Sequence, residues 1–204
     1  MSASQAEGRG FESHRPLQIN SGHETIIKAM QDKGLIHIYT GDGKGKTSSA
    51  LGLTVRARSR GKRIFFAQFF KERSMQGELS LLEQLGITTV VFDAIKSPFF
   101  HPDVDRNITR KETLSALKEI SRAVATGDFD VIVLDEFLCL VSEGILTDEE
   151  AAGFLKNKPE ASEIILTGRG ATEKITSMAD YVTFMKNVKH PYDKGIRARK
   201  GIEV

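Results

Sequence analysis

The stretch that decides the fold is residues 41–48, GDGKGKTS, which follows the apolar run 35–40 (LIHIYT) and precedes a helical pattern. A strand, a glycine-rich turn, Lys-Thr and a helix, in that order, are typical of a phosphate-binding loop. Glycines let the backbone N–H groups turn toward one point, and the N-terminus of the following helix favours an anion. In this arrangement Lys46 reaches the outer phosphates and the Thr47 hydroxyl can hold Mg²⁺.

The spacing of this loop is one residue shorter than the usual pattern G-x-x-x-x-G-K-[ST]. That pattern requires a glycine at position 40, where this chain has Thr40, and the first glycine is Gly41. The loop still predicts binding of a nucleoside triphosphate. Its shortening indicates that the nucleotide is not used in the ordinary way.

The composition is that of a globular protein. With 204 residues, 40% of them hydrophobic and 27% charged, the chain can form one domain with a sizeable core. The net charge of +2 produces no global field that would recruit nucleic acid or a membrane. The single cysteine, Cys139, excludes a disulfide within the chain and is expected to be an inert core thiol. Because the first 20 residues are polar and long apolar runs are missing, we expect a cytoplasmic protein.

From Leu35 onward, short apolar β-branched runs alternate with helical patterns. This alternation predicts an α/β fold of the P-loop NTPase type, RecA-like, with a mostly parallel sheet and helices on both faces. One such domain is expected over 34–204. The expected strands, all of the buried parallel kind, are 35–40, 63–69, 88–92, 130–135, 162–167 and 181–184. The expected helices are 46–60, 76–85, 109–126, 136–143, 147–156 and 171–178.

The N-terminal part of the chain is an appendage to this domain. Residues 1–21 are polar and without periodicity, which predicts a mobile arm. Residues 22–33 predict a short helix with Ile26, Ile27 and Met30 on one face. Two positions for that apolar face remain open, namely the body of the same chain and a partner subunit.

A second motif is an apolar strand that ends in two acids, VIVLDE at 131–136. Carboxyl ends of parallel strands meet at one edge of the sheet, so these acids are expected to face the phosphate loop. Asp135 can then hold Mg²⁺ directly or through water, and Glu136 can complete the shell or orient a nucleophile. The alternative for Asp135 is an N-terminal cap of the next helix. The pairing with the glycine-rich loop favours the metal site.

Three further segments narrow the class of protein. They are AQFFK at 67–71, LTGRG at 166–170 and VKHPYDKGI at 188–196. Together with the shortened loop and the Leu-Asp-Glu strand end, they resemble the P-loop ATP:cob(I)alamin adenosyltransferases. The resemblance runs in order from about residue 23 to 204, and the shortened loop is itself a mark of that family.

The resemblance implies a reaction that the motifs alone do not specify. Members of the family transfer the 5′-deoxyadenosyl group of ATP to the cobalt of cob(I)alamin or another reduced corrinoid, and triphosphate leaves. It implies a role in biosynthesis or salvage of adenosylcobalamin, Mg²⁺ as cofactor, a homodimer and a flavin-type reductant protein. Phosphate-loop amides, a lysine and Mg²⁺ are suited to this chemistry, because negative charge grows on the leaving triphosphate.

The resemblance also assigns roles to residues. Lys46, Thr47 and Glu136 are expected to be catalytic, and Thr47, Asp135 and Glu136 to bind the metal. The residues expected at ATP are Gly41, Asp42, Gly43, Lys44, Gly45, Lys46, Thr47, Ser48, Arg169, Lys189 and His190. A surface ion pair is the alternative for Arg169. The tail residues Lys189 and His190 can touch nucleotide or corrinoid, and His190 can instead be a packed structural histidine.

One departure from the family concerns the corrinoid. Family members use a nearby Phe and Trp to displace the lower ligand of the Co(II) corrinoid, since four-coordinate Co(II) is easier to reduce to Co(I). This chain has no tryptophan. In the matching segment 96–102, Phe99 and Phe100 are expected at the corrinoid, and His101 stands near the Trp position. The alternative is that both phenylalanines pack on the core.

Two other functions remain open at this stage. A phosphoryl-transfer ATPase or kinase would use Glu136 as general base and release ADP. A carrier or regulator would bind corrinoid or nucleotide without turnover. Nucleic-acid binding has little support, because the basic cluster at 56–63 is explained by a solvated helix end.

Overall fold

The computed structural model describes residues 33–203, and its core is a parallel sheet. The six strands have the order β3-β2-β4-β5-β1-β6, with parallel pairing throughout. They are β1 (Ile36–Thr40), β2 (Ile64–Phe69), β3 (Thr88–Phe92), β4 (Val131–Asp135), β5 (Glu163–Thr167) and β6 (Tyr181–Phe184). Each strand lies within one residue of its predicted range. The arm expected at 1–21 and all but the last residue of the helix expected at 22–33 lie outside the described residues.

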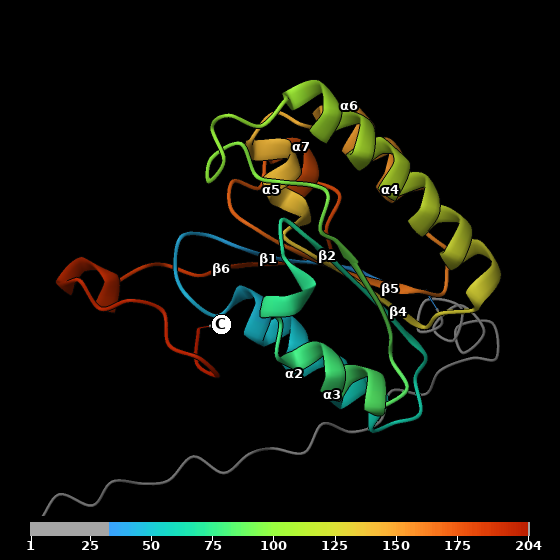
Figure 1. Cartoon of the computed structure of the whole chain (residues 1–204). Helices are drawn as coiled ribbons and strands as arrows, with labels where there is room; N and C mark the ends of the chain where they lie inside the picture. The colour runs from blue at the N-terminus through green and yellow to red at the C-terminus, as the bar shows by residue number, and fades with distance from the viewer. Residues whose placement is uncertain (1–32, 204) are drawn as a thin grey trace, which may run out of the picture. The chain divides into compact units, whose positions relative to one another are not determined.

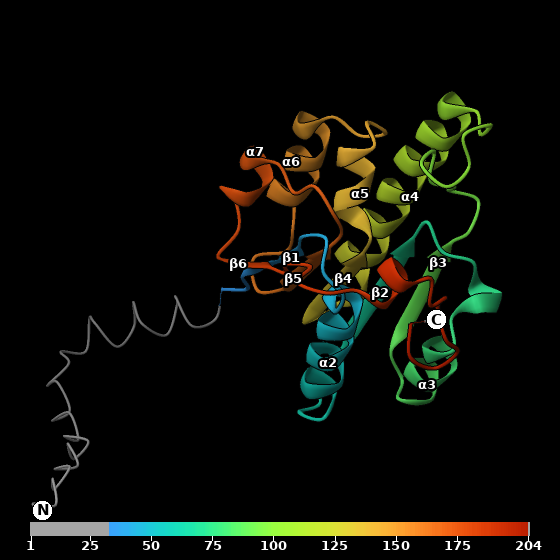
Figure 2. The ribbon, with the colours of Figure 1, turned by 90° about the vertical axis from the view of Figure 1, so that its left-hand side faces the viewer.

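Helices cover both faces of the sheet, as the alternating pattern predicts (Figures 1 and 2). One face carries α2 (Lys46–Arg58) and α3 (Glu78–Gln84). The other carries α4 (Arg106–Gly127), α5 (Phe137–Ser142), α6 (Asp148–Lys156) and α7 (Glu173–Thr176). Short 3₁₀ turns span Arg73–Met75 and Pro191–Lys194. The helix ends lie within three residues of their expected positions.

The central strands divide the core into two layers. In β2, Ile64 and Phe66 pack in the layer under α2 and α3, while Phe65 and Ala67 pack in the layer under α4 to α7. All residues of β2 are buried. A strand buried on both faces must be apolar throughout, which is why its sequence shows a continuous apolar run rather than alternation.

The edge strand β6 differs from the prediction. Its sequence is as apolar as that of the inner strands, and a buried strand was expected there. In the described part of the chain, however, Tyr181, Val182 and Phe184 are about half exposed or more. Because β6 pairs only with β1, its other edge has no neighbouring strand within residues 33–203, and the expectation of burial was wrong.

The sheet order brings the motifs of the sequence together. β5 lies between β1, which leads into the phosphate loop, and β4, which ends in the two acids. The last residues of the three strands therefore share one edge of the sheet. Among residues 33–203, none of the helices combines the length and the apolar character that a membrane crossing requires.

Candidate active site

The phosphate loop, residues 41–48, connects β1 to the N-terminus of α2. Gly41 and Gly45 have φ values of 102° and 118°, a region that side chains other than glycine rarely adopt. The backbone after β6 lies against the loop, so a Cβ at Gly41 would stand 2.4 Å from the Met185 carbonyl oxygen. The Gly43 amide donates to that same oxygen at 2.7 Å. This amide is already paired with the protein, so it is not free to bind a phosphate.

Lys46 is the first residue of α2, and its ammonium group folds back over the loop. It donates to the carbonyl oxygens of Gly41 and Gly43, both at 2.8 Å. Burial lowers the pKa of Lys46 from its ordinary value, and the nearby Glu136 carboxylate opposes that shift. A bound phosphate group would satisfy this ammonium better than two neutral carbonyls, because its oxygens are charged.

Asp135, at the end of β4, is the centre of a buried hydrogen-bond cluster. Its Oδ1 accepts from the hydroxyls of Thr47 at 2.8 Å and Thr167 at 2.6 Å. Its Oδ2 is 3.4 Å from the Nε2 of Gln68, whose own Oε1 has no partner among the described residues. Because Asp135 is fully buried, it lies behind Thr47 rather than in open space.

Glu136 is the acid that faces the open side. Its backbone is left-handed, with φ 62°, and its amide donates to the Thr167 hydroxyl at 2.9 Å. The carboxylate accepts from the Cys139 thiol at 3.0 Å. Burial, reinforced by this carboxylate, raises the pKa of Cys139 to about 12. The thiol therefore stays protonated at neutral pH, as expected for an inert cysteine.

The largest cavity near these residues has a volume of about 450 Å³. It is lined by residues from the phosphate loop, the ends of β2, β4 and β5, the helix α5 and the loop after β3, namely Lys46, Phe70, Lys71, Ser97, Phe99, Phe100, Glu136, Cys139, Ser142, Glu143 and Arg169. One end of the cavity, the phosphate end, is positively charged because Lys46 and Arg169 line it. The other end, the aromatic end, is lined by Phe99 and Phe100.

The aromatic end is a tight turn, residues 97–101, which we call the aromatic turn. The amides of Phe100 and His101 both donate to the Ser97 carbonyl oxygen. Phe99 and Phe100 are 71% and 72% exposed, and their rings meet edge to face with centroids 5.0 Å apart. The alternative that these phenylalanines pack on the core is therefore wrong. Two exposed rings that line a cavity are suited to an apolar ligand.

The tail residues lie apart from this cavity. Lys189 is exposed, and the His190 Nδ1 accepts from the Tyr192 amide at 3.2 Å at the start of the last 3₁₀ turn. Neither residue lines the cavity, so their expected contact with ATP or corrinoid stays a prediction. The tail does reach the phosphate loop elsewhere, since the Lys44 ammonium donates to Glu203 Oε1 at 3.0 Å.

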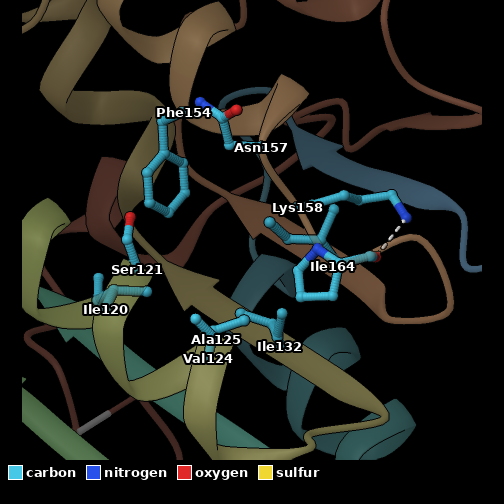
Figure 3. A pocket seen from close by; sticks show the side chains of 10 residues that line it. Ile120, Ser121, Val124, Ala125, Ile132, Phe154, Asn157, Lys158 and Ile164 are labelled. Atoms are coloured by element: carbon cyan, nitrogen blue, oxygen red, sulfur yellow. Dashed lines mark hydrogen bonds between the residues drawn. The ribbon is translucent and has the colours of Figure 1, made fainter.

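A second, smaller cavity of about 60 Å³ lies between α4, α6 and the sheet (Figure 3). Its lining is mostly apolar, with Ile120 and Val124 from α4 and Ile132 and Ile164 from the strands. Ile132 and Ile164 are near the amino ends of their strands, opposite the phosphate loop. This cavity is too small for a nucleotide or a corrinoid, and it lies at the other end of the strands from the phosphate loop.

Comparison with known proteins identifies the chain. Residues 32–204 match the family described as ATP:corrinoid adenosyltransferase BtuR/CobO/CobP. The chain belongs to this family. Among its curated relatives, the corrinoid adenosyltransferase of Escherichia coli (strain K12) is 32% identical over 178 residues, which cover 87% of this chain and 89% of the relative. The corrinoid adenosyltransferase CobA of Salmonella typhimurium is 33% identical over the same shares of the two chains.

A further relative, the corrinoid adenosyltransferase of Pseudomonas aeruginosa, is 31% identical over 180 residues and 88% of each chain. Among solved structures, the flagellar accessory protein FlaH of Methanocaldococcus jannaschii aligns with a TM-score of 0.50 at 14% identity. The alignment covers 74% of this chain and 71% of FlaH, and it concerns the fold alone. Together these findings confirm the predicted fold class and the predicted family of transferases.

Some residues in or behind this adenosyltransferase cavity were not found by sequence analysis. Thr167 ends β5 and Gln68 is the residue before the last of β2, and both contact Asp135; their place near strand ends is the signal that could have found them. Glu143 lies one residue beyond α5, and nothing in its local sequence indicates contact with a loop 46 residues earlier. Only the folded chain brings it to the aromatic turn.

Proposed function

We propose that the protein transfers the 5′-deoxyadenosyl group of ATP to the cobalt of a reduced corrinoid and releases triphosphate. The observation that supports this most directly is the single cavity that joins Lys46 and Arg169 to the exposed rings of Phe99 and Phe100. A nucleotide needs the charged end, and a corrin macrocycle needs a broad apolar surface. Phosphoryl transfer needs phosphate binding, Mg²⁺ and a positioned nucleophile, and none of these requires the aromatic end.

The phosphate loop holds the triphosphate in this proposal. The amides at the N-terminus of α2 favour an anion, and the Lys46 ammonium would exchange the carbonyls of Gly41 and Gly43 for phosphate oxygens. Arg169, at the end of β5, adds a second cation on the same cavity. These groups bind the triphosphate more strongly as its charge grows, which lowers the barrier to its departure.

The oxygen ligands present fit Mg²⁺. Thr47 and Asp135 are in contact through a hydrogen bond of 2.8 Å, and Glu136 follows Asp135 on the open side. Mg²⁺ typically keeps several waters and takes one or two protein oxygens together with phosphate oxygens, so a small donor set suffices. We propose Thr47 and Glu136 as the nearest ligands, with Asp135 holding the Thr47 hydroxyl from behind. When bound, the ion would neutralise charge on the triphosphate.

The reaction is a displacement at carbon. The Co(I) lone pair forms a bond to the ribose C5′, and the bond from C5′ to the triphosphate oxygen breaks with its electron pair. The protein keeps the two reactants in line by binding each at one end of the cavity. No proton has to move in this step, so Glu136 is needed for binding rather than as a base.

The corrinoid end relies on the aromatic turn. We propose that Phe99 and Phe100 contact the lower face of the corrinoid and displace its lower ligand, with His101 near the position that family members give to Trp. Lys189 and His190 are proposed to approach the substrates when these are bound. A homodimer, a flavin-type reductant protein and a role in adenosylcobalamin biosynthesis or salvage complete the proposal.

One experiment tests the transfer. The protein is incubated with Mg-ATP and chemically reduced cob(I)alamin, while the visible spectrum and the phosphate products are followed. A light-sensitive alkylcobalamin together with inorganic triphosphate is the expected result. Release of ADP without a spectral change of the corrinoid would instead favour a phosphoryl-transfer enzyme. Binding of both substrates without any product would favour a carrier.

A further inference from the structure

Glu143, a charged residue of the cavity, has no part in the chemistry just described. Glu143 follows the last turn of α5, and its carboxylate points at the aromatic turn rather than at the phosphate end. Ser97 Oγ lies 2.7 Å from Glu143 Oε2 and 2.9 Å from Oε1. The Phe99 amide donates to the same Oε2 at 3.3 Å. A single carboxylate thus accepts from a side chain and from the backbone of the turn.

These hydrogen bonds hold a segment that has few other restraints. The rings of Phe99 and Phe100 contact each other but are mostly exposed, so packing on the core does not set their position. The Ser97 side chain is buried, with 3% exposure, and its hydroxyl requires a partner there. Glu143 is that partner. Hydrogen bonds to a carboxylate are stronger than those between neutral groups, so they can determine the conformation of the turn.

The carboxylate is itself fixed in space. Phe137, Leu138 and Leu140 bury α5 in the core, and Arg106 donates to the Glu143 carbonyl oxygen. The same short helix begins directly after Glu136, which lies at the phosphate end of the cavity. Because α5 is buried and only a few residues long, it sets the distance between the two ends.

We propose that Glu143 is a positioning residue, which holds the aromatic turn so that Phe99 and Phe100 meet the corrinoid in the orientation that removes its lower ligand. The inference rests on the proposed function, because it concerns the corrinoid end of that site. The proposal gives Glu143 a role only in the stage at which Co(II) is reduced to Co(I). The rings are needed to make Co(II) easier to reduce, and they are not needed once Co(I) is present.

The test compares two starting materials for the full-length protein and its Glu143→Gln variant. In the first assay cob(II)alamin, Mg-ATP and a mild reductant are supplied, and in the second cob(I)alamin is generated chemically beforehand. Loss of one hydrogen bond to a charged group is worth about tenfold, so we expect the variant to be at least about tenfold slower from Co(II). From Co(I), its rate is expected to stay within about twofold of the unaltered protein.

A spectroscopic measurement gives a second readout that a merely structural role would not change. Cob(II)alamin is bound to the protein with Mg-ATP, and its electron paramagnetic resonance spectrum reports whether the lower nitrogen ligand is attached. We expect the unaltered protein to convert part of the bound Co(II) to the four-coordinate form. In Glu143→Gln that fraction should fall, while the amount of bound corrinoid stays the same.

The controls separate failure of this inference from failure of the proposed function. Glu72→Gln makes the same change of charge beside the turn, where Glu72 pairs with Lys96 and, within residues 33–203, has no hydrogen bond to Ser97 or Phe99. It should act like the unaltered protein in both assays. If the unaltered protein forms no alkylcobalamin even from Co(I), the proposed function is wrong. If it does, and Glu143→Gln slows both assays equally or neither, the role of Glu143 is wrong.

Ser97→Ala changes the other partner of the same hydrogen bond, and it replaces Glu143→Gln as the test variant if Glu143→Gln does not fold. It removes the hydroxyl that donates to the carboxylate. Ser97→Ala should also lower the rate from Co(II) but not the rate from Co(I). The double variant Ser97→Ala/Glu143→Gln should be no slower than the slower single variant, because the two residues are partners in one interaction. Independent, additive losses would contradict the proposed contact.

Discussion

The phosphate loop and the aromatic turn lie on the same cavity, yet they are held in different ways. The loop is held by its own backbone, by glycines at positive φ and by the main chain at Met185. The aromatic turn is held by the side chain of Glu143, which belongs to a distant helix. The loop is thus restrained through main-chain atoms, its own and those at Met185, whereas the aromatic turn also depends on one side chain from a remote helix. The phosphate end should therefore be rigid, and the aromatic end should be the part that variants can loosen.

The largest effect is expected at the phosphate loop. Lys46→Ala removes the ammonium that stabilises the growing charge of the triphosphate, and loss of one such group commonly costs at least about 100-fold in rate. Because both routes end in this transfer step, activity should fall from Co(I) and from Co(II) alike, without the selectivity for Co(II) expected at the aromatic turn. The measurement is the rate of alkylcobalamin formation from both starting materials. Lys62→Ala, at an exposed lysine paired with Asp130, should leave both rates unchanged.

A second change tests the rigidity of the loop itself. Gly41→Ala places a Cβ 2.4 Å from the Met185 carbonyl oxygen and imposes an unfavourable φ. We expect a loss of about 2 kcal/mol or more in the free energy of unfolding. A thermal melt should then show Tm lower by about 4 °C or more for a chain of this size.

The matched control for that change is Gly52→Ala, in the middle of α2. There a Cβ would meet no atom of the described residues within 4 Å. Alanine favours the helix by about 0.5–1 kcal/mol, so Tm should rise slightly. Equal behaviour of the two variants would show that the contact with Met185 does not restrain the loop.

A smaller and selective effect is expected at the aromatic turn. Phe100→Ala removes one of two rings in edge-to-face contact, and such pairs are worth about threefold to tenfold in a rate or equilibrium. We expect that loss when cob(II)alamin is the starting material and none when cob(I)alamin is supplied. Leu81→Ala, at an exposed apolar residue of α3, is the control. Unchanged activity of Phe100→Ala from Co(II) would show that the ring does not contact the corrinoid.

The last prediction does not involve activity and concerns Cys139, on the helix that connects the two regions. Burial raises the pKa of its thiol to about 12, so the reactive thiolate forms only as the pH rises toward that value. At pH 8 we expect iodoacetamide to label the folded protein more than about 100-fold more slowly than the protein unfolded in guanidinium chloride. Fast labelling of the folded protein, followed by mass spectrometry, would mean that α5 opens and does not fix the two ends.

Much of the fold could be predicted from local pattern. The inner strands are continuous apolar runs and α4 carries an apolar stripe, so period and composition located them within a few residues. The exposure of β6 could not be predicted, because its residues are as apolar as those of the inner strands. Whether such a strand is covered depends on its position in the sheet order, which no local pattern contains.

The candidate site, like the fold, was predicted only in part from the sequence. The motifs pointed to Lys46, Thr47, Asp135 and Glu136, because phosphate loops and strand-end acids have fixed spacings. They did not show that Asp135 is buried behind Thr47 while Glu136 lines the cavity. This distinction follows from the left-handed backbone of Glu136, which turns its side chain to the open side.

By itself, the sequence determined the phosphate loop, the order of strands and helices along the chain, and the family. These depend on residues close together in the chain, whose backbone preferences and spacing act locally. Only the tertiary structure decided that the phosphate end and the aromatic end share one cavity and that Glu143 holds the aromatic turn. The physical reason is that a hydrogen bond between residues 46 positions apart forms only when the packing of α5 against the sheet brings its partners together.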